Sequence, residues 1–187
     1  MAGAAIGLPA DARRFRTPLV VSAGIAIVGA LVIATVADTF AGGAVGLGYL
    51  AVLSWVVAHD VSSLRAPNRI VLPAMACAAI ASIPFGSSGV AACLGGGTVA
   101  FLVLLVIALV GGGRMGMGDV KFGTLCGMAT GGQGLMMLFA GAFVGGGLVA
   151  AVLLVSRVRQ RRDVIAFTPF LAAGVLMAWL ISGSYFF

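Results

Sequence analysis

Long apolar stretches separated by short polar segments run through the whole chain. Most of these stretches come close to the roughly 20 residues that a helix needs to cross the bilayer core. They lack the alternation of apolar and polar residues that is typical of membrane β-strands. The pattern therefore predicts an all-α, polytopic membrane protein of six to seven transmembrane helices, at about 18–37, 43–58, 69–83, 90–110, 119–129, 135–156 and 164–182.

Composition supports a membrane protein and excludes an ordinary soluble domain. Hydrophobic residues make up 61% of the 187 residues and charged residues only 9%, against about 25% charged residues in soluble domains. We therefore expect a single membrane domain over residues 1–187. The cysteines Cys77, Cys93 and Cys126 lie in apolar stretches without a CxxC pair, and the chain has one histidine. No metal site and no cofactor are expected.

The net charge of +6 describes how the chain lies in its membrane rather than an affinity for nucleic acid. Basic residues near membrane helices mark the cytoplasmic side and contact anionic lipids. With the N-terminus in the cytoplasm, seven crossings place every basic residue on that side. The alternative for the first apolar stretch is a cleaved signal peptide. The basic residues are Arg13, Arg14, Arg16, Arg65, Arg69, Arg114, Lys121, Arg157, Arg159, Arg161 and Arg162.

The same topology brings Asp60 and Asp119 to the cytoplasmic membrane boundary, at the ends of different predicted helices. Two carboxyl groups held close together share a proton, so that one can act as a base and the other as an acid. Such a pair can activate water for hydrolysis of a peptide bond. Gly116 and Gly118, just before Asp119, would let a substrate backbone approach the pair and are candidates for substrate binding.

Three separated motifs make the chain resemble the type IV prepilin peptidase family of membrane aspartic proteases. The GxGD motif of that family is seen here at 116–119, and its Asp-x6-Pro-Asn pattern runs from Asp60 to Asn68. Its late PFxPFLAxG segment corresponds to AFTPFLAAG at 166–174, where Thr168 replaces a common glycine. The resemblance covers roughly residues 50–180, with an extra N-terminal helix at about 18–37.

The resemblance implies that Asp60 and Asp119 are the catalytic pair of an aspartic endopeptidase. This enzyme would remove the leader from prepilin-like precursors at the bacterial cytoplasmic membrane. Larger members also carry paired CxxC motifs and an N-methyltransferase activity, whereas this chain has no CxxC, which implies a short, peptidase-only form. The precursor and the oligomeric state stay open.

Simpler interpretations remain for single residues. Asp119 alone could cap a helix, and Asp60 alone could be a solvated interfacial residue. His59 is expected to be interfacial, and Asp38 and Asp163 are expected to lie outside the pair. A small transporter with proton- or cation-binding aspartates and a structural assembly subunit are the alternative functions. An intramembrane protease of the presenilin kind shares GxGD but carries Tyr-Asp where this chain has His59-Asp60.

Overall fold

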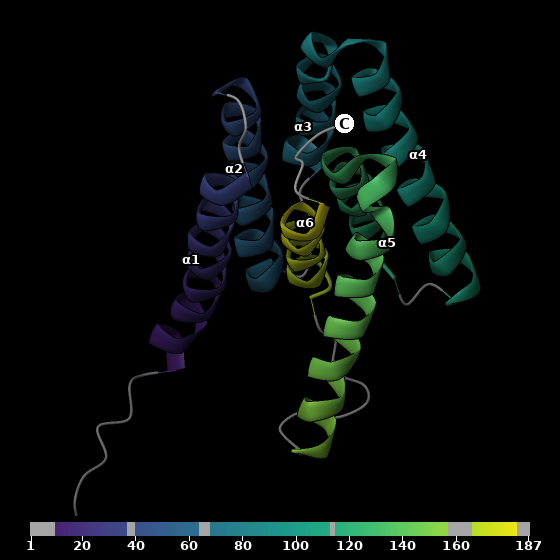
Figure 1. Ribbon diagram of the computed structural model, residues 1–187. Helices are drawn as coiled ribbons and strands as arrows, with labels where there is room; N and C mark the ends of the chain where they lie inside the picture. The colour runs from purple at the N-terminus through teal and green to yellow at the C-terminus, as the bar shows by residue number, and fades with distance from the viewer. Residues whose placement is uncertain (1–9, 37–39, 64–67, 113–114, 157–165, 183–187) are drawn as a thin grey trace, which may run out of the picture.

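A computed structural model describes residues 10–36, 40–63, 68–112, 115–156 and 166–182. In this part of the chain the regular elements are helices and no strand is present, so the predicted all-α class is confirmed. Figure 1 shows these helices side by side in one bundle. They are α1 (Ala10–Val36), α2 (Phe40–Ser63), α3 (Asn68–Ala81), the short 3-10 helix η1 (Ile83–Phe85), α4 (Gly86–Val110), α5 (Met117–Val155) and α6 (Thr168–Ser182).

Four helical segments of the described chain are long and apolar enough to cross a membrane. Helix α6 is apolar but shorter. Large hydrophobic side chains such as Trp55, Leu109 and Val144 are exposed on the outside of the bundle, as suits a protein surrounded by lipid. The chain is therefore a multi-pass membrane protein, and the predicted count of six to seven spans stays a prediction. The four segments are Pro18–Thr35, Gly42–Ser63, Asn68–Val110 and Met117–Val152.

Helix α5 reverses direction at Gly131, which has the non-helical angles φ 59° and ψ −173°. An added Cβ on Gly123, before the reversal, would lie 3.7 Å from Leu171 near the start of α6. An added Cβ on Gly146, after the reversal, would lie 3.3 Å from Phe170 at the same end of α6. The two halves of α5 therefore run antiparallel, and the positive φ explains why glycine stands at the turn.

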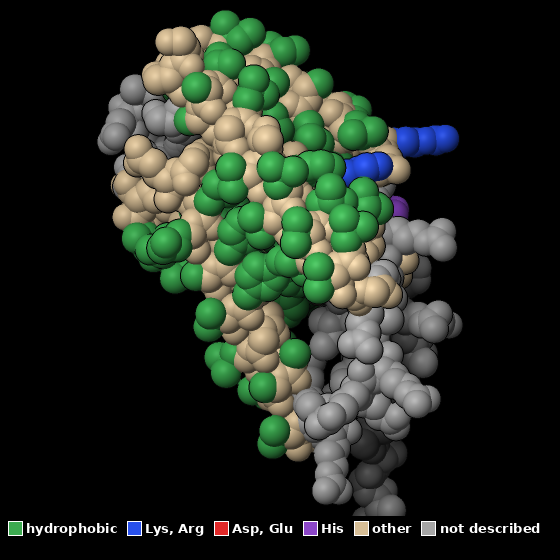
Figure 2. Space-filling view, turned by 90° about the vertical axis from the view of Figure 1, so that its right-hand side faces the viewer, with side chains coloured by type: hydrophobic (Ala, Val, Ile, Leu, Met, Phe, Trp, Pro, Cys, Tyr) green, Lys and Arg blue, Asp and Glu red, His purple; other side chains and the backbone are tan. Residues whose placement is uncertain are grey.

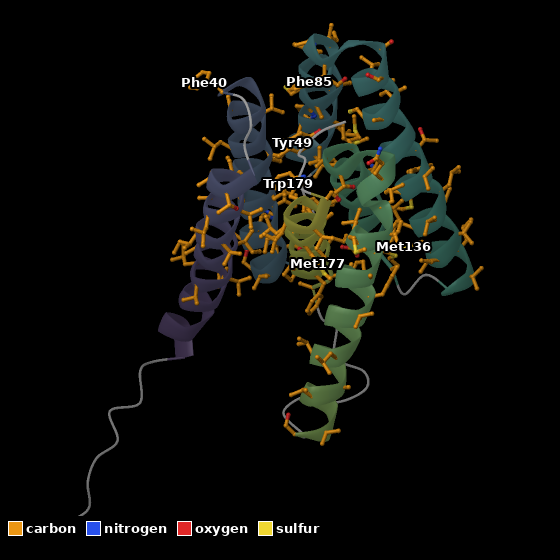
Figure 3. The ribbon with its side chains drawn as sticks, in the orientation of Figure 1. Phe40, Tyr49, Phe85, Met136, Met177 and Trp179 are labelled. Carbon is orange, nitrogen blue, oxygen red and sulfur yellow. The ribbon has the colours of Figure 1, made fainter. Side chains whose placement is uncertain are left out.

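A hydrogen bond from the C-terminal end of α6 stabilises this turn. The indole Nε1 of Trp179 donates a hydrogen bond of 2.8 Å to the carbonyl oxygen of Ala129, two residues before Gly131. Both partners are buried, so the bond supplies a polar contact that water could not. Figure 3 shows Trp179 in the middle of the bundle, at the end of α6.

The short first half of α5 is shielded by its neighbours. Every residue at 122–129 is buried, because α3, α4 and α6 pack against α5. The sequence had predicted a helix at 119–129 that was too short to cross unaided, and shielding was one of its explanations.

Several predicted helix ends were wrong by a few residues. Helix α2 continues to Ser63 instead of ending at Ala58. The hydroxyl groups of Ser62 and Ser63 donate to the carbonyl oxygen of His59, at 2.8 and 2.7 Å, and so stabilise the extra turn. Asp60 therefore lies inside the last turn of α2 rather than at its very end. Helix α1 begins at Ala10, eight residues before the predicted start.

Candidate active site

Asp60 is buried at the end of α2 that approaches α6. Only 3% of its surface is exposed. The hydroxyl Oγ1 of Thr168, at the start of α6, donates a hydrogen bond of 2.8 Å to Asp60 Oδ2. Thr168 is itself fully buried. A buried carboxyl group without such a partner would be costly, so this bond explains how α2 can carry an aspartate into the bundle.

Asp119 lies in the first turn of α5, where the helix dipole favours a negative charge. Its backbone N–H donates to the carbonyl oxygen of Gly116 at 3.0 Å. Its side chain is only partly buried. Asp119 and Asp60 lie close enough for their charges to interact. The two aspartates are therefore within range of a charge interaction, and their role as a catalytic pair at one membrane boundary stays a prediction.

Gly116 and Gly118 adjoin Asp119 without unusual backbone geometry. Neither has the positive φ that favours glycine. An added Cβ on Gly116 would lie 3.6 Å from Asp119 Oδ2, which is ordinary contact. Gly116 is exposed and Gly118 partly buried. For Gly116, the missing side chain leaves room beside the carboxyl group of Asp119, and the role of both glycines in substrate binding stays a prediction.

A second link joins α3 and α5 near the aspartates. The ammonium group of Lys121 donates to Asn68 Oδ1 at 3.2 Å. Asn68 is the first residue of α3. This bond joins α5, close to its start, to the start of α3, a contact that the sequence did not predict for Lys121. In Figure 2 the Lys, Arg and His side chains lie near one edge of a face that is otherwise largely hydrophobic.

His59 is the ionisable residue directly before Asp60 in the chain. It is exposed, and its Nδ1 lies 2.8 Å from Ser63 Oγ; its interfacial position stays a prediction. Asp38 and Asp163 lie outside the described residues, as do Pro67 and Arg114. Among the residues that the structure describes, no group of three or more His, Cys, Asp or Glu side chains could hold a metal ion.

Sequence reasoning missed Thr168 as a partner of Asp60. The only signal was the threonine in the late motif, noted as a departure from the family pattern. A contact between residues 108 positions apart cannot be read from local spacing. The resulting arrangement has a buried carboxyl that accepts a hydrogen bond from a hydroxyl group, and a second, more accessible carboxyl close enough for the two charges to interact. Such a pair can divide the roles of acid and base.

These features place the chain among polytopic helical membrane proteins. Its two carboxyl groups, of Asp60 and Asp119, lie near the end of α2 and the start of α5. Comparison with known proteins identifies the family. Residues 47–151, which include both aspartates, match the model of the type IV leader peptidase family, and the chain belongs to this family.

One curated relative carries the name prepilin leader peptidase/N-methyltransferase and comes from Bacillus subtilis (strain 168). It is 32% identical over 139 residues, which are 73% of this chain and 55% of the relative. The match thus spans about half the length of that relative. No solved structure gives a significant match.

Proposed function

We propose that the protein is a membrane aspartic endopeptidase that removes the leader peptide from prepilin-like precursors. The observation that carries this proposal is that Asp60 and Asp119, from distant parts of the segment that matches the family, lie close enough for their charges to interact. The name of the Bacillus subtilis relative supports the substrate class.

The pair would act on a water molecule between the two carboxyl groups. One carboxylate takes a proton from the water as its oxygen attacks the scissile carbonyl carbon. The other carboxyl, which is protonated, donates a hydrogen bond to the carbonyl oxygen. The C–N bond then breaks, and a proton passes to the leaving amine. Gly116 would leave space beside Asp119 for the extended substrate, and Gly118 is the second candidate for contact with it.

The membrane face follows from the charge pattern. Asp60 and Asp119 lie near helix ends whose connecting segments carry basic residues, and such segments favour the cytoplasm. A precursor with a polar leader in the cytoplasm and an apolar segment in the bilayer would present its junction at this boundary. The site would therefore cut at the cytoplasmic face of the bacterial inner membrane.

Asparagine substitutions test the proposal, because asparagine keeps the shape of aspartate but neither donates nor accepts a proton in catalysis. We expect Asp60→Asn and Asp119→Asn each to lower precursor cleavage by at least about a hundredfold. Mass spectrometry of a purified precursor in proteoliposomes would measure the products. His59→Gln, which changes the exposed neighbour of Asp60, is the control and should cleave normally.

The outcome separates the alternatives. Normal cleavage by either asparagine variant would exclude that aspartate from the pair. If the wild-type protein cleaves no precursor but carries an ion flux that both variants lose, the site belongs to a transporter. If all variants support pilus assembly equally, the protein is a structural subunit of the assembly machinery.

A further inference from the structure

An apolar groove of about 510 Å³ runs between α2 and α3. The residues that line it lie on one side of α2 and one side of α3, and Leu125 of α5 also lines it. In Figure 3, Tyr49 lies on the side of α2 towards α3. Arg69 is the only charged residue of the lining. The walls include Val45, Gly48 and Val52 of α2, and Arg69, Pro73 and Cys77 of α3.

The groove is open rather than filled by the protein itself. Gly48, Pro73 and Cys77 are exposed. An added Cβ on Gly48 would meet no atom within 4 Å. Internal packing therefore does not explain glycine at this position. A molecule in the bilayer could enter the groove from the side.

The ends of the groove differ chemically. Arg69, at one end, is an exposed cation at the start of α3, and its charge must stay near water. From Arg69 to Ala81, at the other end, the wall extends over 12 residues of helix, or about 18 Å. A molecule that fits the groove would thus be a long apolar helix, and its polar end would lie beside Arg69.

The polar end of the groove leads to the aspartate pair. Val52 lies eight residues before Asp60 on α2, which is about 12 Å along the helix. About four residues of extended chain would cover this distance. Arg69 follows Asn68, whose side chain is bonded to Lys121, two residues after Asp119. A helix leaving the groove at this end would deliver its continuing chain to both carboxyl groups.

We propose that this groove binds the apolar helix of the precursor and aligns the scissile bond with Asp60 and Asp119. The proposal rests on the proposed function, because that function requires an apolar segment joined directly to the peptide that is cut. The groove is apolar along about 18 Å, which accommodates about 12 residues of such a helix, and its one charged residue, Arg69, lies at the end nearer the site. A second groove, of about 330 Å³ between α5 and α6, has no charged residue in its lining.

Three glycines allow a matched test, because an added Cβ on Gly48, Gly147 or Gly95 meets no atom within 4 Å. Gly48 lines the proposed groove, Gly147 lines the second groove, and Gly95 lies on the exposed side of α4. We expect Gly48→Leu to lower kcat/KM for the precursor about tenfold or more, and the other two leucine variants to change it less than about twofold. Thermal unfolding of each purified variant checks that the bundle is intact.

Cross-linking provides a test that does not depend on cleavage. Cys77 is exposed in the groove, whereas Cys93 and Cys126 are buried. In the Asp119→Asn background, Cys77 should form a disulfide on copper-phenanthroline oxidation with single cysteines placed along one face of the precursor's apolar helix. Cys77→Ser should abolish the product, and an excess of precursor without cysteine should compete with it.

The results separate the two proposals. If the wild-type protein cleaves the precursor while Gly48→Leu behaves like Gly95→Leu and no cross-link forms, the peptidase stands and the groove proposal is overturned. If Gly147→Leu is the variant that blocks cleavage, the precursor binds between α5 and α6 instead. If cross-links form but the wild-type protein does not cleave, the groove stands and the peptidase fails. A groove occupied only by lipid would give no competed cross-link, which also overturns the proposal.

Discussion

Asp60 shows how one side chain can shape the chemistry of this site. A carboxyl group with 3% of its surface exposed has lost most of its contact with water. Its hydrogen bond to Thr168 replaces part of that contact, and hydrogen bonds to charged groups contribute about 1.5–3 kcal/mol. In the proposed mechanism this bond would hold one carboxyl oxygen, so that the other is directed at the reacting water. This gives Thr168 the proposed role of a positioning residue for Asp60.

This role predicts a difference between two substitutions of Thr168. Thr168→Val keeps the shape of the side chain but removes the hydroxyl donor, whereas Thr168→Ser keeps the donor. We expect the valine variant to lose about tenfold to a hundredfold in kcat, as 1.5–3 kcal/mol implies, and the serine variant to stay near the wild-type rate. The measurement is kcat and KM for a purified precursor across a range of pH.

The pH profile distinguishes positioning from simple stability. A valine variant that is only less stable would lose active enzyme without changing the shape of the profile. A valine variant with a lost hydrogen bond to Asp60 should have an altered profile, and serine should restore it. Equal activity of all three proteins would show that the bond between Thr168 and Asp60 has no part in catalysis.

Among the helices, close packing between α4 and α5 depends on glycine. Gly96 of α4 faces Gly127 of α5, and both are buried. An added Cβ on Gly96 would overlap the carbonyl oxygen of Gly127 and lie 2.8 Å from the carbonyl carbon of Gly131. Small residues of this kind let the backbones of membrane helices approach closely. The contact also reaches Gly131, where α5 reverses.

The neighbouring glycine offers a matched pair of alanine substitutions. Gly96→Ala should destabilise the protein by about 1–3 kcal/mol, because backbone atoms must move to admit the methyl group. Gly95→Ala should be neutral or slightly stabilising, since it meets open space and alanine favours helix. Thermal unfolding in detergent would compare the two. If Gly96→Ala is as stable as Gly95→Ala, the helices do not pack this closely.

The sequence predicted the helices better than their ends and contacts. Runs of apolar residues are strong signals for membrane helices, and so the all-α class was predictable. The end of α2 depends on hydroxyl groups that bond back to His59, a local effect that hydropathy does not register. The contact between Thr168 and Asp60 depends on the packing of α6 against α2, and no pattern in either segment indicates it.

At the scale of the whole molecule, the chemistry gathers at one end of the bundle. The hydrogen bond between Asp60 and Thr168 joins the end of α2 to the start of α6, and the bond between Lys121 and Asn68 joins the starts of α5 and α3. Figure 3 shows Phe40, where α2 begins, and Phe85, just before α4, together at the opposite end. The site end is also the end whose connecting segments carry the basic residues.

This polarity predicts the side of the membrane from which each end can be reached. Ser62, near the site, and Ser87, at the start of α4, are both exposed, and each can be replaced by cysteine in a Cys77→Ser background. A membrane-impermeant maleimide should label Ser62→Cys only from the cytoplasmic side and Ser87→Cys only from the opposite side, because basic segments resist translocation. Labelling in the reverse sense would keep the bundle but place the aspartates on the outer face, where a cytoplasmic leader could not reach them. Labelling of both positions from one side would mean that α3, which lies between them in the chain, does not cross the bilayer.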